Sequence, residues 1–209
     1  MKKIAFFHFP KAAGSFLLNY INEFLNDYFY NAKHHKYTDI KEKINSLYKI
    51  AFVRNPFAWY VSRYFYFARE VSRVEGGISI QCDSGLWGKE FTDKFPMPEH
   101  HILWGLKEVP NFSFTYRFNE MFLDENGKNR IDFIGKTETL YEGFEMALKN
   151  QNIPLPAISL KDYYEIHKNN QSHTNSTIHE HYTRYHTPKT IKLIKHFDAG
   201  ILKKYNYSF

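Results

Sequence analysis

The stretch FFHFPKAAGS (residues 6–15) joins an apolar run to a lysine and a turn of small residues. An apolar run with aromatic residues, as in KIAFFHF (3–9), is typical of a strand covered on both faces. After Gly14 the apolar residues return at helical spacing, and Ser15 stands near the start of that helix. The start of a helix presents unpaired N–H groups and a partial positive charge, so this stretch is suited to hold an anion.

Length and composition narrow the possible classes of protein. The 209 residues, 43% hydrophobic and 19% aromatic, predict one domain over residues 1–209 with a sizeable core. The net charge of +6 favours an anionic partner without choosing among nucleotide, glycan, nucleic acid and membrane surface. A single cysteine, Cys82, excludes an internal disulfide and fits a reducing compartment. The apolar runs are too short for a membrane span or a signal peptide, so we expect a cytoplasmic protein with no integral membrane segment.

Strand-like runs and helical spacings alternate along the chain. Strands are expected at 3–9, 49–54 and 131–136, and helices at 16–28, 56–73, 86–95, 100–106, 139–151 and from 187 to about 203. Thr187 is expected to cap the last helix, with Pro188 in its first turn. The alternation predicts an α/β fold, a three-layer sandwich with a central parallel sheet. Ligands of such sheets bind beyond the carboxyl ends of the strands, where Lys11 and Arg54 both fall.

A second anion-binding pattern, VRNPFAWYVS (53–62), follows the second predicted strand. Arg54 ends that strand, and its planar guanidinium suits a terminal phosphate. Ser62 lies two turns into the next helix, within about one arginine side chain of the strand end at ~1.5 Å per residue. Either pattern alone fits an ordinary strand–helix turn at least as well. Two anion sites at neighbouring strand ends, however, suit a nucleotide with phosphates at both its 5′ and 3′ ends.

Taken together, FHFPKAAGSFL (7–17) and FVRNPFAWYVSRY (52–64) resemble the sulfotransferases that use 3′-phosphoadenosine-5′-phosphosulfate (PAPS). The resemblance is greatest to the branch with the carbohydrate sulfotransferases, and it is weakest over residues 70–125. KHHKYTDIKEKI (33–44), IDFIGKTETL (131–140) and the tail from residue 181 agree in order and spacing. The resemblance implies the sulfotransferase fold, which is similar to that of the P-loop nucleotide hydrolases. The family usually has a threonine after the loop lysine, where this chain has Ala12.

The resemblance implies the residues that hold the donor. The donor-binding residues would be Lys11, Ala12, Ala13, Gly14, Ser15, Phe16, Arg54 and Ser62. The first loop would hold the 5′-phosphosulfate, whereas Arg54 and Ser62 would hold the 3′-phosphate. The spent donor would be adenosine 3′,5′-bisphosphate. Its leaving phosphate is already held by cationic and amide donors, so no metal is expected to be required.

The resemblance also implies catalytic residues. By analogy with phosphoryl transfer, catalysis depends on positioning and on stabilising the leaving group, where Lys11 is expected to count most. Relatives place a histidine or glutamate base between the first helix and the second strand, a stretch that here offers His34 and His35. We favour His35, because HKYTDIK (35–41) then aligns with a pattern in which a histidine precedes a short helix. His8 is a further candidate, and ordinary surface histidines are an equal alternative for His34 and His35.

The acceptor is expected to be a glycan hydroxyl, with a lipid, a small metabolite or a peptide tyrosine as alternatives. Residues 70–125 are expected to shape its site. The candidate substrate-binding residues are His8, His100, His173 and Asn175. The loop KNNQSHTNST (168–177), which carries two of them, is of the polar kind that meets ligands more often than it packs.

Two other classes of protein were weighed against this prediction. A nucleotide-dependent kinase would need four residues between the loop glycines, a lysine after the second one, and acidic residues for magnesium. A nucleic-acid-binding protein is disfavoured because no block of like charge stands out and the aromatic residues have core-like spacing. The histidines of HEHYTRYH (179–186) match no common zinc spacing, so no metal site is predicted there.

Overall fold

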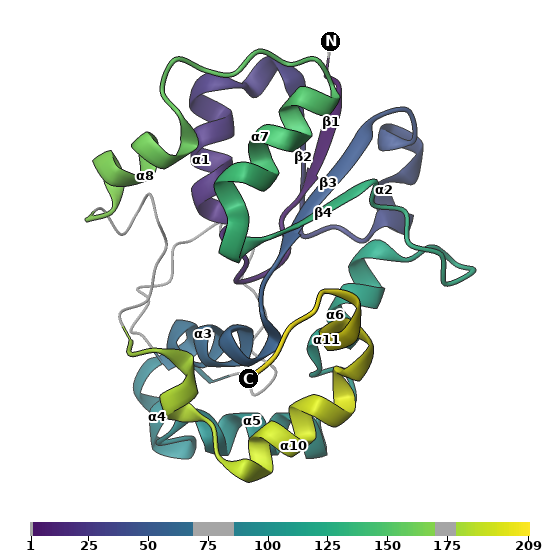
Figure 1. The fold of residues 1–209 in the computed structure, drawn as a ribbon. Helices are drawn as coiled ribbons and strands as arrows, with labels where there is room; N and C mark the ends of the chain where they lie inside the picture. Colours follow the sequence, from purple (N-terminus) through teal and green to yellow (C-terminus); the bar gives the residue numbers. More distant parts are fainter. Residues whose placement is uncertain (1, 69–85, 170–178) are drawn as a thin grey trace. The chain divides into compact units, whose positions relative to one another are not determined.

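The computed structural model describes residues 2–68, 86–169 and 179–209 (Figure 1). By contacts between residues, the chain divides into two compact units. The first unit is Met1–Arg54 with Phe118–Ser176, and the second is Asn55–Arg117 with Thr177–Phe209. Among the described residues, every strand lies in the first unit, and the second is built from helices and the segments that join them.

A parallel sheet of four strands forms the centre of the first unit, with the strand order β2-β1-β3-β4 (Figure 1). The strands are β1 (Ile4–Phe7), β2 (Phe29–Lys33), β3 (Tyr48–Val53) and β4 (Phe133–Lys136). The register pairs Phe7 with Lys33 on one side and Ala51 on the other, and it pairs Val53 with Lys136. The carboxyl ends of neighbouring strands are therefore adjacent. The predicted α/β fold with a central parallel sheet is confirmed.

Helices cover both faces of this sheet, as alternate strand residues require. On one face, Ile4, Phe6, Ile50 and Phe52 belong to a buried apolar cluster with residues of α1 (Gly14–Phe24), α7 (Leu140–Asn150) and α8 (Leu160–His167). On the other face, the ring of Phe7 packs edge-on against Phe122 at the end of α6 (Phe114–Phe122), 6.2 Å between centroids. Figure 1 shows α1 and α7 on one side of the sheet and α2 on the other.

The segment 31–46, which is basic and polar in sequence, contains part of an edge strand and a helix. β2 begins at Phe29, directly after the predicted helix at 16–28, and α2 runs over Tyr37–Ile44. Only Phe29 and Ala32 of β2 are buried, because an edge strand has one open side. A strand with so few apolar residues gives a weak sequence pattern, which is why it was missed.

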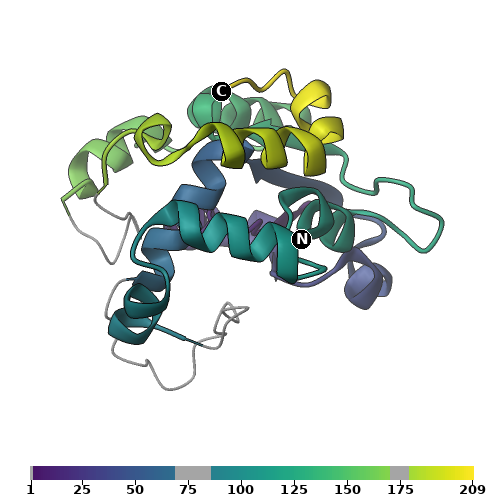
Figure 2. The same ribbon diagram turned by 90° about the horizontal axis from the view of Figure 1, so that it is seen from below.

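The second unit is a helical assembly around aromatic side chains. Its elements are α3 (Pro56–Ala68), α4 (Gly88–Lys94), α5 (Pro98–Glu108), the start of α6, η3 (Tyr182–Tyr185), α10 (Pro188–Phe197) and α11 (Ala199–Lys204). Tyr64, Phe67, Phe91 and Phe95 form a buried cluster between α3 and α4. Helices α5 and α10 lie side by side (Figure 2).

The C-terminal region follows the sequence prediction at its start and departs from it at Asp198. Thr187 caps α10 through a reciprocal pair of bonds with Thr190, and Pro188 is in the first turn, as predicted. The helix then breaks at Asp198, whose buried carboxylate accepts hydrogen bonds from the Tyr60 hydroxyl and the Thr115 N–H, both 2.8 Å. Because this carboxylate turns inward to the start of α6, the chain continues as a separate helix, α11. No helix in the described ranges is long and apolar enough to cross a membrane.

Candidate active site

The carboxyl end of each strand in the sheet leads to a basic or imidazole side chain. His34 directly follows β2, His8 directly follows β1, Arg54 directly follows β3, and Lys136 is the last residue of β4. Because these strands are parallel and paired side by side, the four residues follow one edge of the sheet. Lys11, three residues after His8, adds a further charge to the same edge. This is the edge where open parallel sheets bind ligands, and its charge suits an anion.

The loop after β1 has an unusual backbone. Lys11 and Ala13 both have a φ of +59°, in the left-handed region that non-glycine residues enter at a cost of roughly 1–2 kcal/mol each. Ala13 is also the residue that precedes α1, and no side chain caps the helix there. Main-chain N–H groups in left-handed turns form concave anion sites, and the helix start adds unpaired donors. The loop therefore combines a lysine with a main chain shaped to bind an anion.

Gly14, the first residue of α1, is required by its neighbour. A Cβ atom at this position would lie 1.7 Å from Cδ2 and 2.2 Å from Nε2 of the His8 ring. Those distances are far inside van der Waals contact, so any larger residue would displace the ring or the loop. The glycine of KAAGS is thus explained by the imidazole packed against it, rather than by its own backbone angles.

The imidazole rings of His8 and His34 pack against each other at the ends of β1 and β2. Their ring centroids are 4.3 Å apart, and the planes are tilted by 37°. Burial, the positive charge of His34 and that of Lys11 lower the pKa of His8 to about 3. Burial also lowers the pKa of His34, opposed by a hydrogen bond to the main chain of His8 and assisted by the charge of His35. Both rings are therefore neutral at pH 7, the state in which an imidazole accepts a proton.

The two base candidates, one residue apart, have different surroundings. His34 is half-buried, and its Nδ1 atom is buried with no hydrogen-bond partner in the part of the chain that the structure describes. The side chain of His35 is exposed, and its main-chain N–H donates to the Ala32 carbonyl at 3.1 Å. The structure thus brings His34, and not His35, against His8. The role of base remains a prediction for both residues.

The remaining predicted donor-binding residues fall in both units. Ala12 and Phe16 are buried, and the Phe16 ring packs against Tyr163, 5.8 Å between centroids. Any ligand contact of Phe16 would therefore come from its main chain. Ser15 is half-buried at the start of α1. Arg54 is half-buried in the first unit, and Ser62 is buried on α3 in the second.

The predicted substrate-binding residues are less concentrated. His8 lies at the sheet edge described above, whereas His100 is exposed on α5 in the second unit. His173 and Asn175 lie outside the described residues. Sequence reasoning did not count Lys136 among the site residues. The sequence held the signal, because Lys136 ends a predicted strand just as Arg54 does.

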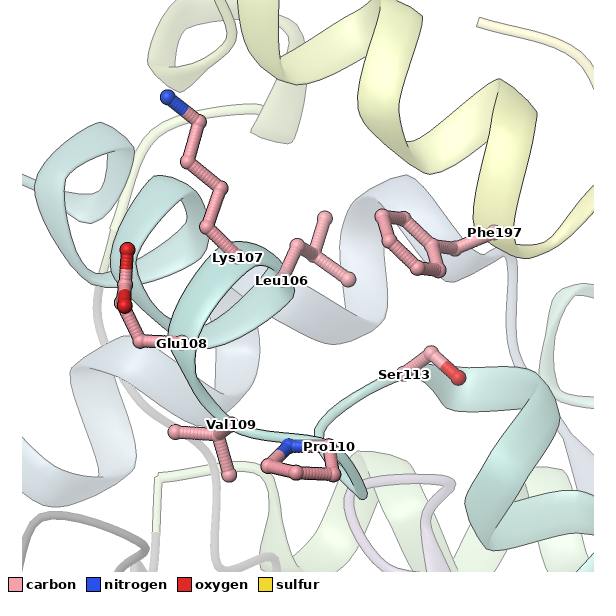
Figure 3. Close-up of a pocket in the computed structure, with 7 residues that line it drawn as sticks. All are labelled: Leu106, Lys107, Glu108, Val109, Pro110, Ser113 and Phe197. Carbon is pink, nitrogen blue, oxygen red and sulfur yellow. The ribbon is translucent and has the colours of Figure 1, made fainter.

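A separate small pocket occurs in the second unit (Figure 3). It has a volume of about 200 Å³ and is lined by Leu106, Lys107, Glu108, Val109, Pro110, Ser113 and Phe197. Figure 3 shows Leu106 and Phe197 facing each other, with Lys107 and Glu108 directed away. Ligand sites usually occupy about 300–1,000 Å³. None of the predicted site residues that the structure describes lines this pocket, so it is not the candidate active site.

Comparison with known proteins assigns the chain to a family. Residues 1–197 match a protein-family model described as "Sulfotransferase family". A comparison with curated proteins found no match. The matched range contains all the strands of the central sheet and every residue predicted to bind donor or acceptor.

Proposed function

We propose a donor and an acceptor for this chain, which belongs to the sulfotransferase family. Membership makes the protein a transferase of sulfuryl groups, and its central parallel sheet flanked by helices agrees with the sulfotransferase fold. We propose that the donor is PAPS and that the acceptor is a hydroxyl group of a glycan. The observation that carries the donor assignment is the register of β1, β3 and β4, which makes the ends leading to Lys11, Arg54 and Lys136 neighbours.

The loop after β1 would bind the 5′-phosphosulfate. The Lys11 ammonium supplies a full positive charge, and the left-handed loop with the start of α1 supplies main-chain donors. Ser15 adds a hydroxyl at the first turn of α1. Ala12 contributes no hydroxyl, so more of the binding falls on the main chain and on Lys11.

Arg54 would bind the 3′-phosphate, and the part that the sequence assigns to Ser62 stays a prediction. A guanidinium forms two parallel hydrogen bonds to a phosphate, which fixes both its position and its orientation. Lys136, the residue paired with Val53 in the neighbouring strand, would add charge on the other side of Arg54. Adenosine with phosphates at both ends would then lie along the sheet edge.

Transfer would proceed by in-line displacement at sulfur. The acceptor hydroxyl gives its proton to a neutral imidazole while its oxygen forms a bond to sulfur. The bond between sulfur and the bridging phosphate oxygen breaks, and adenosine 3′,5′-bisphosphate leaves. Negative charge grows on that phosphate, where Lys11 and the loop N–H groups stabilise it. These donors already neutralise the leaving group, so the proposed reaction needs no metal ion.

Of the two adjacent histidines, His34 is the better base on geometry. Its ring is half-buried and held by a hydrogen bond to the His8 main chain, and among the described residues its Nδ1, itself buried, has no hydrogen-bond partner. An exposed ring such as that of His35 loses more rotational freedom when it engages a substrate. Comparing His34→Ala with His35→Ala decides the matter. If the His35 variant loses more kcat, the base is His35.

Ligand-induced stabilisation tests the donor. At a concentration 100 times its Kd, a ligand adds about 2.7 kcal/mol to folding. For a chain of this size we expect adenosine 3′,5′-bisphosphate to raise the melting temperature by roughly 5–10 °C. ATP with magnesium and single-stranded DNA are the comparison ligands, because they represent a kinase and a nucleic-acid-binding protein. A larger shift with either would reject PAPS as the donor. Transfer of labelled sulfate to a panel of glycans, lipids and tyrosine peptides then tests the acceptor.

A further inference from the structure

We propose that His8 is a positioning residue, whose ring sets the distance between the Lys11–Ser15 loop and the imidazole of His34. This inference rests on the proposed function, because it assigns a role within the site proposed for sulfuryl transfer. His8 would not itself contact the transferred group. It would hold the leaving-group side of the reaction and the base side at a fixed separation.

The contact between His8 and the loop is the first observation. The Cδ2–Nε2 edge of the ring occupies the space beside the Gly14 Cα, where a Cβ would stand 1.7 Å from Cδ2. The ring can approach so closely only because residue 14 is glycine. Gly14 opens α1, so this contact fixes the helix start and the loop before it.

The contact between His8 and His34 is the second observation. The two rings lie 4.3 Å apart between centroids, and the His34 ring also hydrogen-bonds the main chain of His8. Residue 8 therefore holds His34 both by its ring and by its backbone. His8 packs against the loop on one side and against the candidate base on the other.

His8 is neutral, as expected for a residue that positions its neighbours rather than donating a proton. The charged or titratable groups that act on His8 are His34 and Lys11, and on His34 there is also His35. All of them are cationic when protonated, and burial disfavours the charged form further. His8 therefore stays neutral throughout the pH range of ordinary assays. A neutral ring adds no repulsion to the Lys11 ammonium that the donor requires.

A pair of alanine substitutions tests the steric half of the proposal. Gly14→Ala should lower the melting temperature by roughly 3–10 °C, as expected for overpacking a tight contact. In a His8→Ala background the same change should cost little, because the added methyl group enters the space the ring has left. Gly200→Ala is the matched control, since a Cβ there meets no atom of the described residues within 4 Å. Equal losses from Gly14→Ala in both backgrounds would overturn the proposal.

The pH dependence of activity tests the positioning half. His8→Ala should lower kcat by about 10²-fold, the effect of a small misplacement at a reacting centre. It should also move the acidic limb of the kcat/KM profile to higher pH. Water that enters the vacated space would relieve the burial that lowers the pKa of His34. A merely structural loss would scale activity equally at every pH, and that result would overturn the proposal.

Titration of the His34 ring by NMR separates this proposal from the proposed function. In the wild type its pKa should lie below 6.5, and in His8→Ala it should rise toward that value. This measurement and the melting temperatures need no sulfuryl transfer. If the protein binds no PAPS, the proposed function fails while these experiments still decide the role of His8. If His8→Ala is too unstable to isolate, His8→Asn vacates part of the same space and replaces it. An unchanged His34 titration would reject the positioning role even in an active sulfotransferase.

Discussion

His8 and His101 are both histidines whose pKa is lowered mainly by burial. His8 follows a strand of the sheet and lies against Gly14 and His34. His101 is fully buried on α5, with the rings of Phe91, Phe95 and Phe112 about it at centroid distances of 5.0–5.2 Å. Within the described part of the chain, neither nitrogen of His101 has a hydrogen-bond partner.

The difference shows that burial and a shifted pKa do not by themselves mark an active site. The guanidinium of Arg63 lies over the Phe112 ring, 4.8 Å from its centroid, and its charge further lowers the pKa of His101. Among aromatic rings, a neutral imidazole mainly fills space. The topology separates the two residues, because only His8 lies at the edge where parallel strands bind ligands.

Loss of the loop lysine is the largest effect that the comparison predicts. Lys11→Ala should lower kcat by ~10²–10³-fold, the usual loss when a donor to developing charge is removed. Steady-state transfer of labelled sulfate measures it, and the circular dichroism spectrum should be unchanged. Lys149→Ala is the control, because Lys149 is exposed on α7 and forms a surface ion pair with Glu145 at 3.4 Å. If both variants lose activity equally, the sheet edge has no special role.

Loss of the strand-end arginine should mainly affect donor binding. Arg54→Ala should raise the KM for PAPS by roughly 10–100-fold, as expected for hydrogen bonds between charged groups. The kcat should fall less than it does in Lys11→Ala, because the 3′-phosphate is remote from the reacting sulfur. Arg54→Lys should recover only part of the loss, since an ammonium cannot form the paired bonds. An unchanged donor KM would remove Arg54 from the site.

Substitution of His101 should change the stability of the protein at acidic pH rather than its activity. The folded-state pKa of His101 lies well below 6.5, so below that pH the unfolded chain binds a proton that the folded chain does not. Because of His101, the free energy of unfolding therefore decreases by about 1.4 kcal/mol for each pH unit as the pH falls below 6.5. His101→Phe should reduce the pH dependence of stability by this amount and leave the contributions of His8 and His34, as followed by urea unfolding from pH 7 to pH 5. A variant that kept the wild-type slope would show that His101 can be protonated in the folded protein.

The smallest predicted effect is a gain in stability within the candidate site. Ala13→Gly should raise the free energy of unfolding by about 1 kcal/mol, because glycine adopts the φ of +59° without the cost that a Cβ imposes. Thermal melts measure the change. The loop should keep its shape, so the donor KM should stay within about twofold of the wild type. A loss of stability would mean that Ala13 makes packing contacts that outweigh its backbone strain.

The sequence predicted the parts of the fold that have strong apolar patterns. β1, β3 and β4 are largely apolar runs, whereas β2 presents polar residues to its open edge and was missed. The break at Asp198 depends on a carboxylate bonded to Tyr60 and Thr115, two residues distant in sequence. A local sequence pattern cannot predict such a contact.

For the candidate site, the sequence predicted where some residues lie in the fold, and their roles stay predictions. Lys11 and Arg54 could be identified because each follows an apolar strand, and the parallel sheet then makes those strand ends neighbours. The sequence could not show which of His34 and His35 packs against His8. That depends on the direction of each side chain after β2, a strand that was not predicted. The fit of His8 against Gly14 is likewise a matter of distances that residue spacing does not contain.

The left-handed backbone at residues 11 and 13 has a consequence for how this protein can change. At position 13, glycine would relieve the backbone strain and remove no reactive group. Selection for stability and selection for activity therefore do not oppose each other there. At position 11 they conflict, because the glycine that would relax the chain would also discard the ammonium group. Selection for thermal stability alone, in evolution or in the laboratory, would therefore favour Lys11→Gly. The resulting protein would be more stable and inactive.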